Sequence, residues 1–361
     1  MLGFRKQSVL GVDFGTSHIK AVELTVGGNG VPRLVNYGHI EMLSPEEKNA
    51  SFFSVEKSLD KEVARRFDLL LQRLDVKSKS INVALPGSSG LVSLVELPQM
   101  TEHEIERAIQ FEATKHIPLP LDEVAFSWEI VSQKENNTSN ESQKKKMIDV
   151  LLVAALRKEV ERFEQYVKNS KLAMNLLELE IFSIARSVTW GNKLSGFSLI
   201  VDIGSRATNL ILVREGAVYL NRSFSTGSGE ITATLVKSFG VSTDRAEEIK
   251  QGDRDFFNNR ESALAFSAID LVTSEISRIF DMNAKKYPSH AIERIVLSGG
   301  VANMHGFQKY IANLYHVPVS IIDPWKNIVC DEILQSALVQ IGSSFSVAVG
   351  LALGGIESRK K

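Results

Sequence analysis

Two short segments of this 361-residue chain repeat one pattern, and the repeat constrains the fold more than any other feature. The segments are "VDFGTSHIKAVEL" at 12–24 and "VDIGSRATNLILV" at 201–213. Their alignment pairs Asp13 with Asp202, Gly15 with Gly204, and Thr16 with Ser205. Each turn follows an apolar strand and precedes another strand. One such turn in each half predicts two related lobes that share a cleft.

The chemistry of these turns suits a nucleoside triphosphate. Glycine lets the backbone approach an anion closely. Successive N–H groups in a tight turn bind phosphate oxygens, and the hydroxyls of Thr16 and Ser17 add donors. Lys20 would neutralise phosphate charge. Asp13 and Asp202 end their strands and are predicted to hold a hydrated Mg²⁺, an ion that takes few protein carboxylates.

A third element is "LSGGVANMHGF" at 297–307, where an apolar strand runs into Gly299 and Gly300. A surface without side chains there could lie against a flat purine, and a helix is expected to start near Asn303. The alternative is a structural strand–turn–helix corner.

A fourth element is "AEEIK", in which Glu247 and Lys250 lie three residues apart on one predicted helix face. From this face they could reach a ribose and a base. The alternative is a surface ion pair.

Several classes of protein are excluded or disfavoured. The chain has no G-x-x-x-x-G-K-[ST] motif and no G-x-G-x-x-G at a strand-to-helix turn, which disfavours a P-loop or dinucleotide fold. Its 42 Lys and Arg balance 43 Asp and Glu, which argues against a nucleic-acid binder. One cysteine, Cys330, permits no internal disulfide. No window reaches the roughly 18 apolar residues of a membrane span, so we expect a cytoplasmic protein.

Apolar periodicity predicts the order of the elements. Between the two repeats lies a strand–helix–strand–strand–helix unit, about 88–172, whose first helix starts with Thr101 and Glu104 in capping-box spacing. The polar run 132–146 predicts an exposed, mobile loop. After the second repeat, helices are expected at about 229–239, 243–251 and 261–287, followed by strands and a final helix.

These elements in this order resemble the actin/Hsp70/sugar-kinase superfamily of ATP-binding proteins. Within it, the chain resembles the PilM family of type IV pilus assembly proteins, relatives of the cell-division protein FtsA. The most specific stretch is "HIPLPLDEV", because it lies outside the shared ATP site. The other matching stretches are "GFRKQSVLGVDFGTSHIKAVEL", "EIERAIQFEATKHIPLPLDEV", "LIVDIGSRATNLILV", "RAEEIK" and "VLSGGVANMHGF".

The resemblance implies an α/β, actin-like fold: a ribonuclease H-like, duplicated, two-lobe ATPase with an inserted strand–helix–strand–strand subdomain. The expected domains are a first lobe at 8–87 with about 173–195, the inserted subdomain at 88–172, and a second lobe at 196–356 that includes a helical subdomain at about 229–288.

The resemblance also implies roles for individual residues toward ATP and Mg²⁺. Glu180 corresponds to a water-orienting glutamate of filament-forming relatives, although a helix-entry carboxylate is the alternative. Arg206 departs from the usual small-residue pattern, which argues for slow turnover rather than against binding. The remaining positions are Asp13, Gly15, Thr16, Ser17 and Lys20 in the first phosphate loop, Asp202, Gly204 and Ser205 in the second, Gly299, Gly300 and Asn303 in the adenosine motif, and Glu247 and Lys250 at the nucleoside.

The implied partner is the N-terminal peptide of an inner-membrane, PilN-like protein. The peptide is expected in a groove between the first lobe and the 88–172 insertion, which would place a cytoplasmic chain at the inner membrane through that partner. Self-association is also compatible with the resemblance. Two alternatives remain: an FtsA-like division protein that polymerises at the membrane, and a small-metabolite kinase on the same fold.

Overall fold

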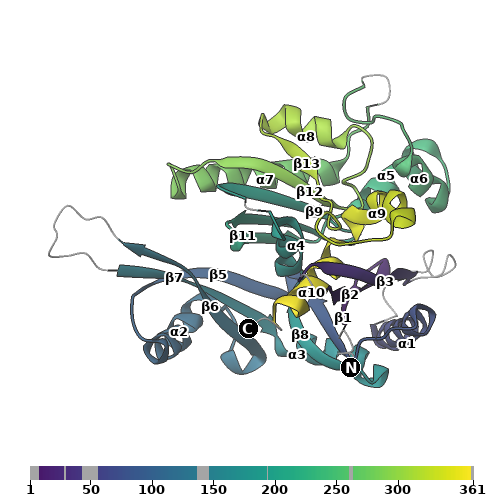
Figure 1. The fold of residues 1–361 in the computed structure, drawn as a ribbon. Helices are drawn as coiled ribbons and strands as arrows, with labels where there is room; N and C mark the ends of the chain where they lie inside the picture. Colours follow the sequence, from purple (N-terminus) through teal and green to yellow (C-terminus); the bar gives the residue numbers. More distant parts are fainter. Residues whose placement is uncertain are drawn as a thin grey trace.

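The computed structural model describes residues 8–27, 30–42, 56–135, 146–192, 194–259 and 263–358. Within these ranges the strands form three sheets, two of five strands and one of three. The two five-stranded sheets occupy separate halves of the molecule, one above the other in Figure 1, with helices α4 (Glu180–Thr189) and α10 (Ser346–Glu357) between them.

The two larger sheets have the same topology, which is the duplicated arrangement that the repeat predicts. In each, three strands form an antiparallel meander, and two further strands run parallel to the first. The first sheet, in the order β3-β2-β1-β4-β8, contains β1 (Val9–Phe14), β2 (His18–Val26), β3 (Pro32–Glu41), β4 (Ser80–Leu85) and β8 (Ala173–Leu179). The second, in the order β11-β10-β9-β12-β13, contains β9 (Phe197–Ile203), β10 (Thr208–Arg214), β11 (Ala217–Phe224), β12 (Ile292–Gly299) and β13 (Val319–Ile321).

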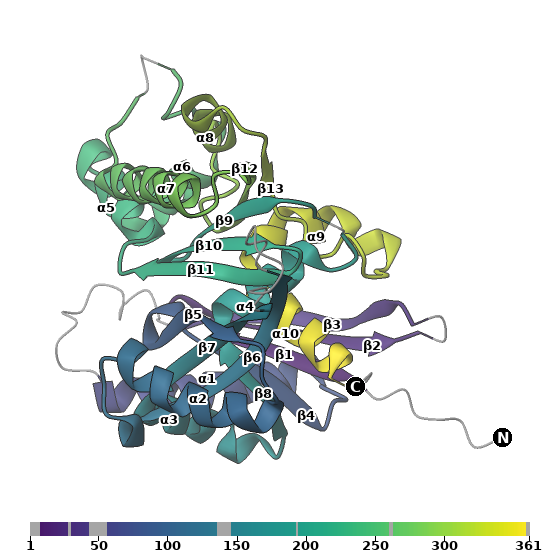
Figure 2. The ribbon, with the colours of Figure 1, turned by 90° about the vertical axis from the view of Figure 1, so that its left-hand side faces the viewer.

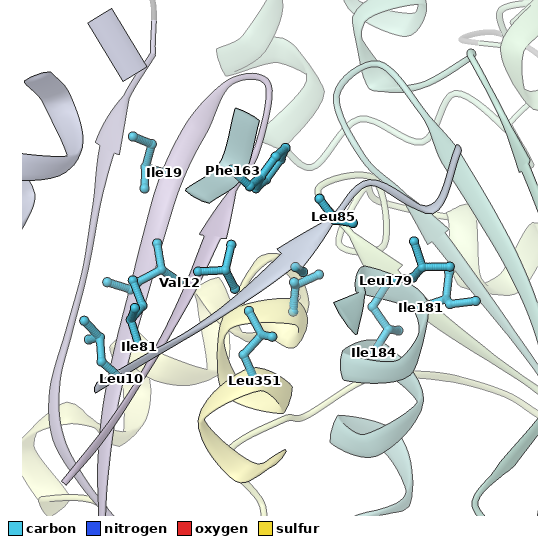
Figure 3. Close-up of a cluster of buried hydrophobic side chains, with 14 of the residues drawn as sticks. Leu10, Val12, Ile19, Ile81, Leu85, Phe163, Leu179, Ile181, Ile184 and Leu351 are labelled. Atoms are coloured by element: carbon cyan, nitrogen blue, oxygen red, sulfur yellow. The ribbon is translucent and has the colours of Figure 1, made fainter. Parts of the chain in front are cut away.

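Aliphatic side chains join the first sheet to the two central helices. Figure 3 shows Val12 of β1 and Ile81 of β4 on the side of Leu351 of α10, with Ile181 and Ile184 projecting from α4. All five side chains have no exposed surface. Burial of each contributes about 1.5–3 kcal/mol relative to exposure, so this cluster holds the first sheet against the two central helices.

Helix α10 is buried from Ser346 to Ile356. Gly350 lets it cross α4 closely, because a Cβ at this position would lie 1.9 Å from the carbonyl oxygen of Ser183. Among the described residues, no single helix has the length and apolar character of a membrane span. The pair Glu332–Ser344 and Ser346–Glu357 meets that test only together, with a 98° bend between its members.

The inserted sheet has the order β5-β7-β6, with β5 (Gly90–Pro98), β6 (Val124–Glu135) and β7 (Lys146–Leu156). Helix α2 (Glu102–His116) packs on it, and the backbone N–H of Thr101 donates to Glu104 at 2.8 Å, as the capping box predicts. Most of the predicted polar loop at 132–146 lies outside the described residues.

The last helix of the inserted unit packs elsewhere than the sequence order suggests. Helix α3 (Arg157–Val167) inserts Phe163 and Val167 into the core of the first lobe, beside α1 (Glu56–Leu74). Tyr166 also joins this core and donates a hydrogen bond to Asp60 of α1 at 2.5 Å. The boundaries of the expected domains stay a prediction, with α3 shared between the insertion and the first lobe.

The second lobe carries the remaining helices, and two of them start later than expected. The helix predicted at about 261–287 begins at Ser267, because the preceding segment is extended and the N–H of Leu264 donates to the carbonyl of Phe256. The helix predicted near Asn303 begins at Phe307, after a turn that ends at Gly306 with φ +81°. The helices that the second lobe carries are α5 (Ser228–Phe239), α6 (Thr243–Gln251), α7 (Ser267–Lys286), α8 (Phe307–Tyr315) and α9 (Gln335–Ile341).

Candidate functional site

The first acidic turn joins β1 to β2. Asp13 stands opposite Lys20 in the strand register, and the Lys20 Nζ lies 3.6 Å from Asp13 Oδ2. The turn between them is tight, because a Cβ at Gly15 would lie 2.8 Å from the carbonyl oxygen of His18. Thr16, at its tip, is exposed. Local strand pairing therefore brings together the whole predicted first phosphate loop, with Ser17 in the same turn.

Asp13 is poorly solvated, since only 13% of its side chain is exposed. Burial raises the pKa of its carboxyl, and the charge and hydrogen bond of Lys20 act in the opposite direction. A carboxylate in this position favours a nearby cation.

The second acidic turn joins β9 to β10 in the same way. The N–H of Gly204 donates to the carbonyl of Ala207 at 2.9 Å, which closes the turn. The carbonyl oxygens of Gly204 and Ser205 accept from the N–H groups of Ser228 and Gly229 at 2.8 and 2.9 Å. The second predicted phosphate loop is thereby fixed on the first turn of α5, and Arg206 beside it is exposed.

Asp202, at the end of β9, is buried. Burial raises the pKa of its carboxyl, and the negative charge of Asp13 raises it further. A hydrogen bond from Ser298, the charge of Lys20 and a hydrogen bond from Asn209 act against this rise. The two aspartates therefore interact electrostatically although they belong to different sheets.

Glu180, the first residue of α4, completes a group of three carboxyls. Its Oε1 accepts from the backbone N–H of Gly87 at 2.8 Å and from Asn209 Nδ2 at 2.9 Å. Burial, followed by the charge of Asp202, raises the pKa of Glu180 to about 7, and Asp13 adds to the rise. Glu180 therefore titrates near neutral pH and lies within electrostatic reach of both aspartates.

The third turn ends β12. Gly299 has φ +83°, and a Cβ there would lie 2.2 Å from the carbonyl oxygen of Ile203, so only glycine fits against the end of β9. A Cβ at Gly300 would meet nothing within 4 Å. Asn303 lies in the following turn, and its Nδ2 donates to Gln340 O and to Ser343 Oγ, both at 3.1 Å. Asn303 thus anchors this open glycine surface to α9 and the segment after it.

Glu247 and Lys250 bond to each other and to α5. The Lys250 Nζ lies 2.6 Å from Glu247 Oε2 and donates to Thr232 Oγ1 at 3.0 Å. The Lys250 side chain is only 7% exposed, whereas that of Glu247 is 41% exposed. The pair therefore differs from the expected surface ion pair, because its ammonium group is buried. No described contact of this network reaches Asp13 or Asp202.

The carboxyl groups of this site suit a hydrated magnesium ion. Among the described residues, no group of three or more His, Cys, Asp or Glu could hold a metal on protein ligands alone. Mg²⁺ keeps several waters and commonly takes one or two carboxylates plus phosphate oxygens. Asp13 and Asp202, both with raised pKa values, fit that requirement because a cation would supply the charge that burial leaves uncompensated.

Two residues of this site were missed by sequence reasoning. Asn209 follows Asp202 at the same spacing at which Lys20 follows Asp13. Within each pair, the two residues stand opposite each other on neighbouring strands. The aligned repeats therefore carried a signal for Asn209. Gly87 carried no comparable signal, since its amide meets Glu180 only through the tertiary fold.

A known protein family matches most of the chain. The family model described as "Type IV pilus assembly protein PilM" matches residues 11–356.

Two curated relatives are cell division proteins. FtsA of Pseudomonas aeruginosa PAO1 is 21% identical over 390 residues, covering 97% of this chain and 90% of the relative. FtsA of Borreliella burgdorferi B31 is 24% identical over 399 residues, covering 98% of this chain and 92% of the relative.

Two solved structures share the fold. A chain of the PilM–PilN type IV pilus biogenesis complex superposes with a TM-score of 0.76 and 21% identity, covering 96% of this chain and 98% of that chain. MreB 5 of Spiroplasma citri bound to AMPPNP superposes with a TM-score of 0.53 and 13% identity, covering 99% of this chain and 98% of that chain. The predicted actin-like fold is confirmed by these likenesses.

Proposed function

Since this chain belongs to the PilM family of type IV pilus assembly proteins, we propose that it is an ATP-binding scaffold of that assembly. In this role it binds the cytoplasmic N-terminal peptide of a PilN-like inner-membrane protein and couples nucleotide state to the machine. Its location is cytoplasmic, at the inner membrane through that partner.

One observation carries the nucleotide part of the proposal. Two acidic turns occupy equivalent positions of two sheets and lie close enough for the charge of Asp13 to act on Asp202. The solved MreB 5 structure with the same fold contains AMPPNP, which supports ATP as the ligand. The open surface at Gly300 supports a place for a flat base.

The residues of the cleft have distinct roles in this proposal. Asp13 and Asp202 hold the hydrated Mg²⁺, which supplies positive charge to the phosphates when bound. Backbone N–H groups of the two turns, with Thr16 and Ser205, bind phosphate oxygens, and Lys20 neutralises their charge.

Glu180 orients a water for attack in line with the γ-phosphate. Its hydrogen bonds to Gly87 and Asn209 hold its Oε1, so the carboxyl has a defined direction. With its pKa at about 7, roughly half of the carboxyls are protonated at neutral pH. Only the ionised half can accept a proton from water, which by itself lowers the rate about twofold. We expect turnover to be slow because Arg206 replaces a small residue in the second turn.

The inserted subdomain is the proposed site of the partner. A chain solved in the PilM–PilN complex has this chain's fold over nearly its whole length, which supports a PilN-like peptide as the occupant. An extended peptide gains affinity from main-chain hydrogen bonds and specificity from side-chain pockets. We place it between the first lobe and the inserted sheet. The FtsA division proteins are only distant relatives of this chain, at 21% and 24% identity. No observation of this kind favours a division protein or a metabolite kinase.

The test uses a synthetic peptide of the cytoplasmic N-terminus of the PilN-like protein from the same genome. Binding to the full chain is measured by calorimetry with and without Mg-AMPPNP, and a peptide of the same composition in scrambled order is the control. We expect saturable binding of the native peptide and of Mg-AMPPNP. Lack of Mg-AMPPNP binding would remove the nucleotide role, and equal binding of both peptides would remove the partner role.

A further inference from the structure

Gly87 is the point where the inserted sheet is rooted against the second lobe. It opens the short turn Gly87–Ser89 that leads from β4 into β5. A Cβ at Gly87 would lie 2.4 Å from Asn209 Oδ1 and 2.7 Å from Ser223 Oγ. The backbone of the insertion's root therefore touches two side chains from β10 and β11.

Four groups form a continuous hydrogen-bonded chain at this point. The Ser223 Oγ donates to Asn209 Oδ1 at 2.6 Å, and Asn209 Nδ2 donates to Glu180 Oε1 at 2.9 Å. The same Glu180 oxygen accepts from the N–H of Gly87 at 2.8 Å. The Asn209 side chain is 2% exposed and both ends of its amide are bonded, so its orientation is defined.

This chain of bonds joins three parts of the molecule. Ser223 and Asn209 belong to the second sheet, Glu180 begins the connecting helix α4, and Gly87 precedes the inserted sheet. Strand β5 also neighbours β11, which in turn contacts α4 (Figure 2). A change in the spacing of the lobes must therefore alter these bonds or move the root of β5.

We propose that Asn209 is the positioning residue of an inter-lobe latch that transmits occupancy of the cleft between Asp13 and Asp202 to the inserted sheet. The inference rests on the proposed function, since the ligand that acts on the latch is Mg-nucleotide. Asn209 stands opposite Asp202 in the register of β9 and β10, so it adjoins the proposed metal site directly. Through Glu180 and Gly87 the same side chain reaches the first residues of β5. The latch thus supplies the contact that differs between two lobe spacings, which coupling requires.

Hydrogen exchange of the full chain, read by mass spectrometry with and without Mg-AMPPNP, tests the latch. In the wild type we expect the nucleotide to slow exchange over 87–98 by at least about fivefold, the lower end of typical couplings. Each variant is compared at a concentration of Mg-AMPPNP that saturates it, as measured by calorimetry. At saturation Asn209→Ala should lose this slowing, and Ser223→Ala, which lies on β11 away from Asp202, should bind as the wild type does and reduce it. The matched control is Asn283→Ala, because Asn283 is similarly buried in the second lobe and bonds to the carbonyl of His290 outside the latch.

The outcomes separate the latch from the proposed function. If Asn209→Ala and Ser223→Ala both bind Mg-AMPPNP and slow exchange over 87–98 as the wild type does, the latch is wrong and nucleotide binding stands. If the wild type binds no Mg-AMPPNP, the proposed function fails instead. Exchange without nucleotide then still tests the bonds, because Asn209→Ala should speed exchange at 87–90 at least about fivefold while Asn283→Ala leaves it unchanged. Unchanged exchange in Asn209→Ala would overturn the latch without reference to any ligand.

Discussion

Asp13 and Asp202 occupy the same position in two sheets of identical strand order, and the charge of the first raises the pKa of the second. Each is the penultimate residue of the first strand of its sheet. Two desolvated carboxylates that repel each other, with Lys20 as the cation that acts on both, form an electrostatically unfavourable arrangement. A bound cation would relieve it, which supports the proposed metal site.

Neutralising Asp202 should weaken nucleotide binding without weakening the fold. In Asp202→Asn we expect the affinity for Mg-AMPPNP to fall at least about tenfold, or roughly 1.4 kcal/mol, because one proposed metal ligand is lost. The Tm without ligand should stay equal or rise, since burial raises the pKa of this carboxyl and thus disfavours its charged form. Calorimetry and thermal melts check both, with the exposed Asp281→Asn on α7 as the control. A lower affinity with an equally lowered Tm would point to a folding defect instead.

Glu180 should make stability depend on pH. Its folded-state pKa of about 7 exceeds the ordinary value of 4.5, so the folded chain holds this proton more tightly than the unfolded chain. The stabilisation is present below pH about 4.5 and is lost as pH rises through about 7, with a total of at most about 3 kcal/mol. Glu180→Gln cannot titrate and should gain stability relative to the wild type between pH 5 and pH 8.

Urea unfolding of Glu180→Gln and the wild type at pH 5 and pH 8 measures this difference in the free energy of unfolding. Glu96→Gln, which removes an exposed carboxylate on β5, is the control and should run parallel to the wild type. Parallel profiles of Glu180→Gln and the wild type would contradict the raised pKa.

Gly350→Ala should destabilise the chain despite lying inside a helix. Alanine favours a helix interior over glycine by about 0.8–1 kcal/mol. The added Cβ, however, would lie 1.9 Å from the Ser183 carbonyl oxygen on α4, and overpacking of this kind costs about 1–3 kcal/mol. We therefore expect a net loss in the free energy of unfolding. Gly252→Ala, whose Cβ would have its nearest neighbour at 3.4 Å, should be near neutral, and equal stabilities of the two variants would refute the close helix crossing.

Lys250 should matter for stability before it matters for binding. Lys250→Ala leaves Glu247 and Thr232 without their ammonium partner, and hydrogen bonds to charged groups contribute about 1.5–3 kcal/mol each. The exposed Lys237→Ala on α5 should change the free energy of unfolding by less than about 0.5 kcal/mol. Denaturant unfolding of both variants without nucleotide measures the difference in stability between them. A Lys250→Ala protein as stable as the wild type would contradict this structural role.

The sequence by itself determined the architecture of this protein to a large extent. Apolar periodicity and turn residues are local, so they predicted the meanders, most helices and the acidic turns before any contact was known. The repeated Asp-x-Gly pattern predicted the duplicated lobes, because one copy lies between two strands in each half of the chain. The positions of Asp13 and Asp202 at the strand ends follow from the same local rules.

Only the tertiary structure decided how the side chains of the cleft act on one another. The pKa of Glu180 depends on burial and on charges from two different sheets, which no local pattern encodes. The contact of Gly87 with Asn209, the place of α3 in the core of the first lobe and the burial of Lys250 likewise join residues far apart in the chain. Burial and distance set these energies, and both quantities exist only once the chain has folded.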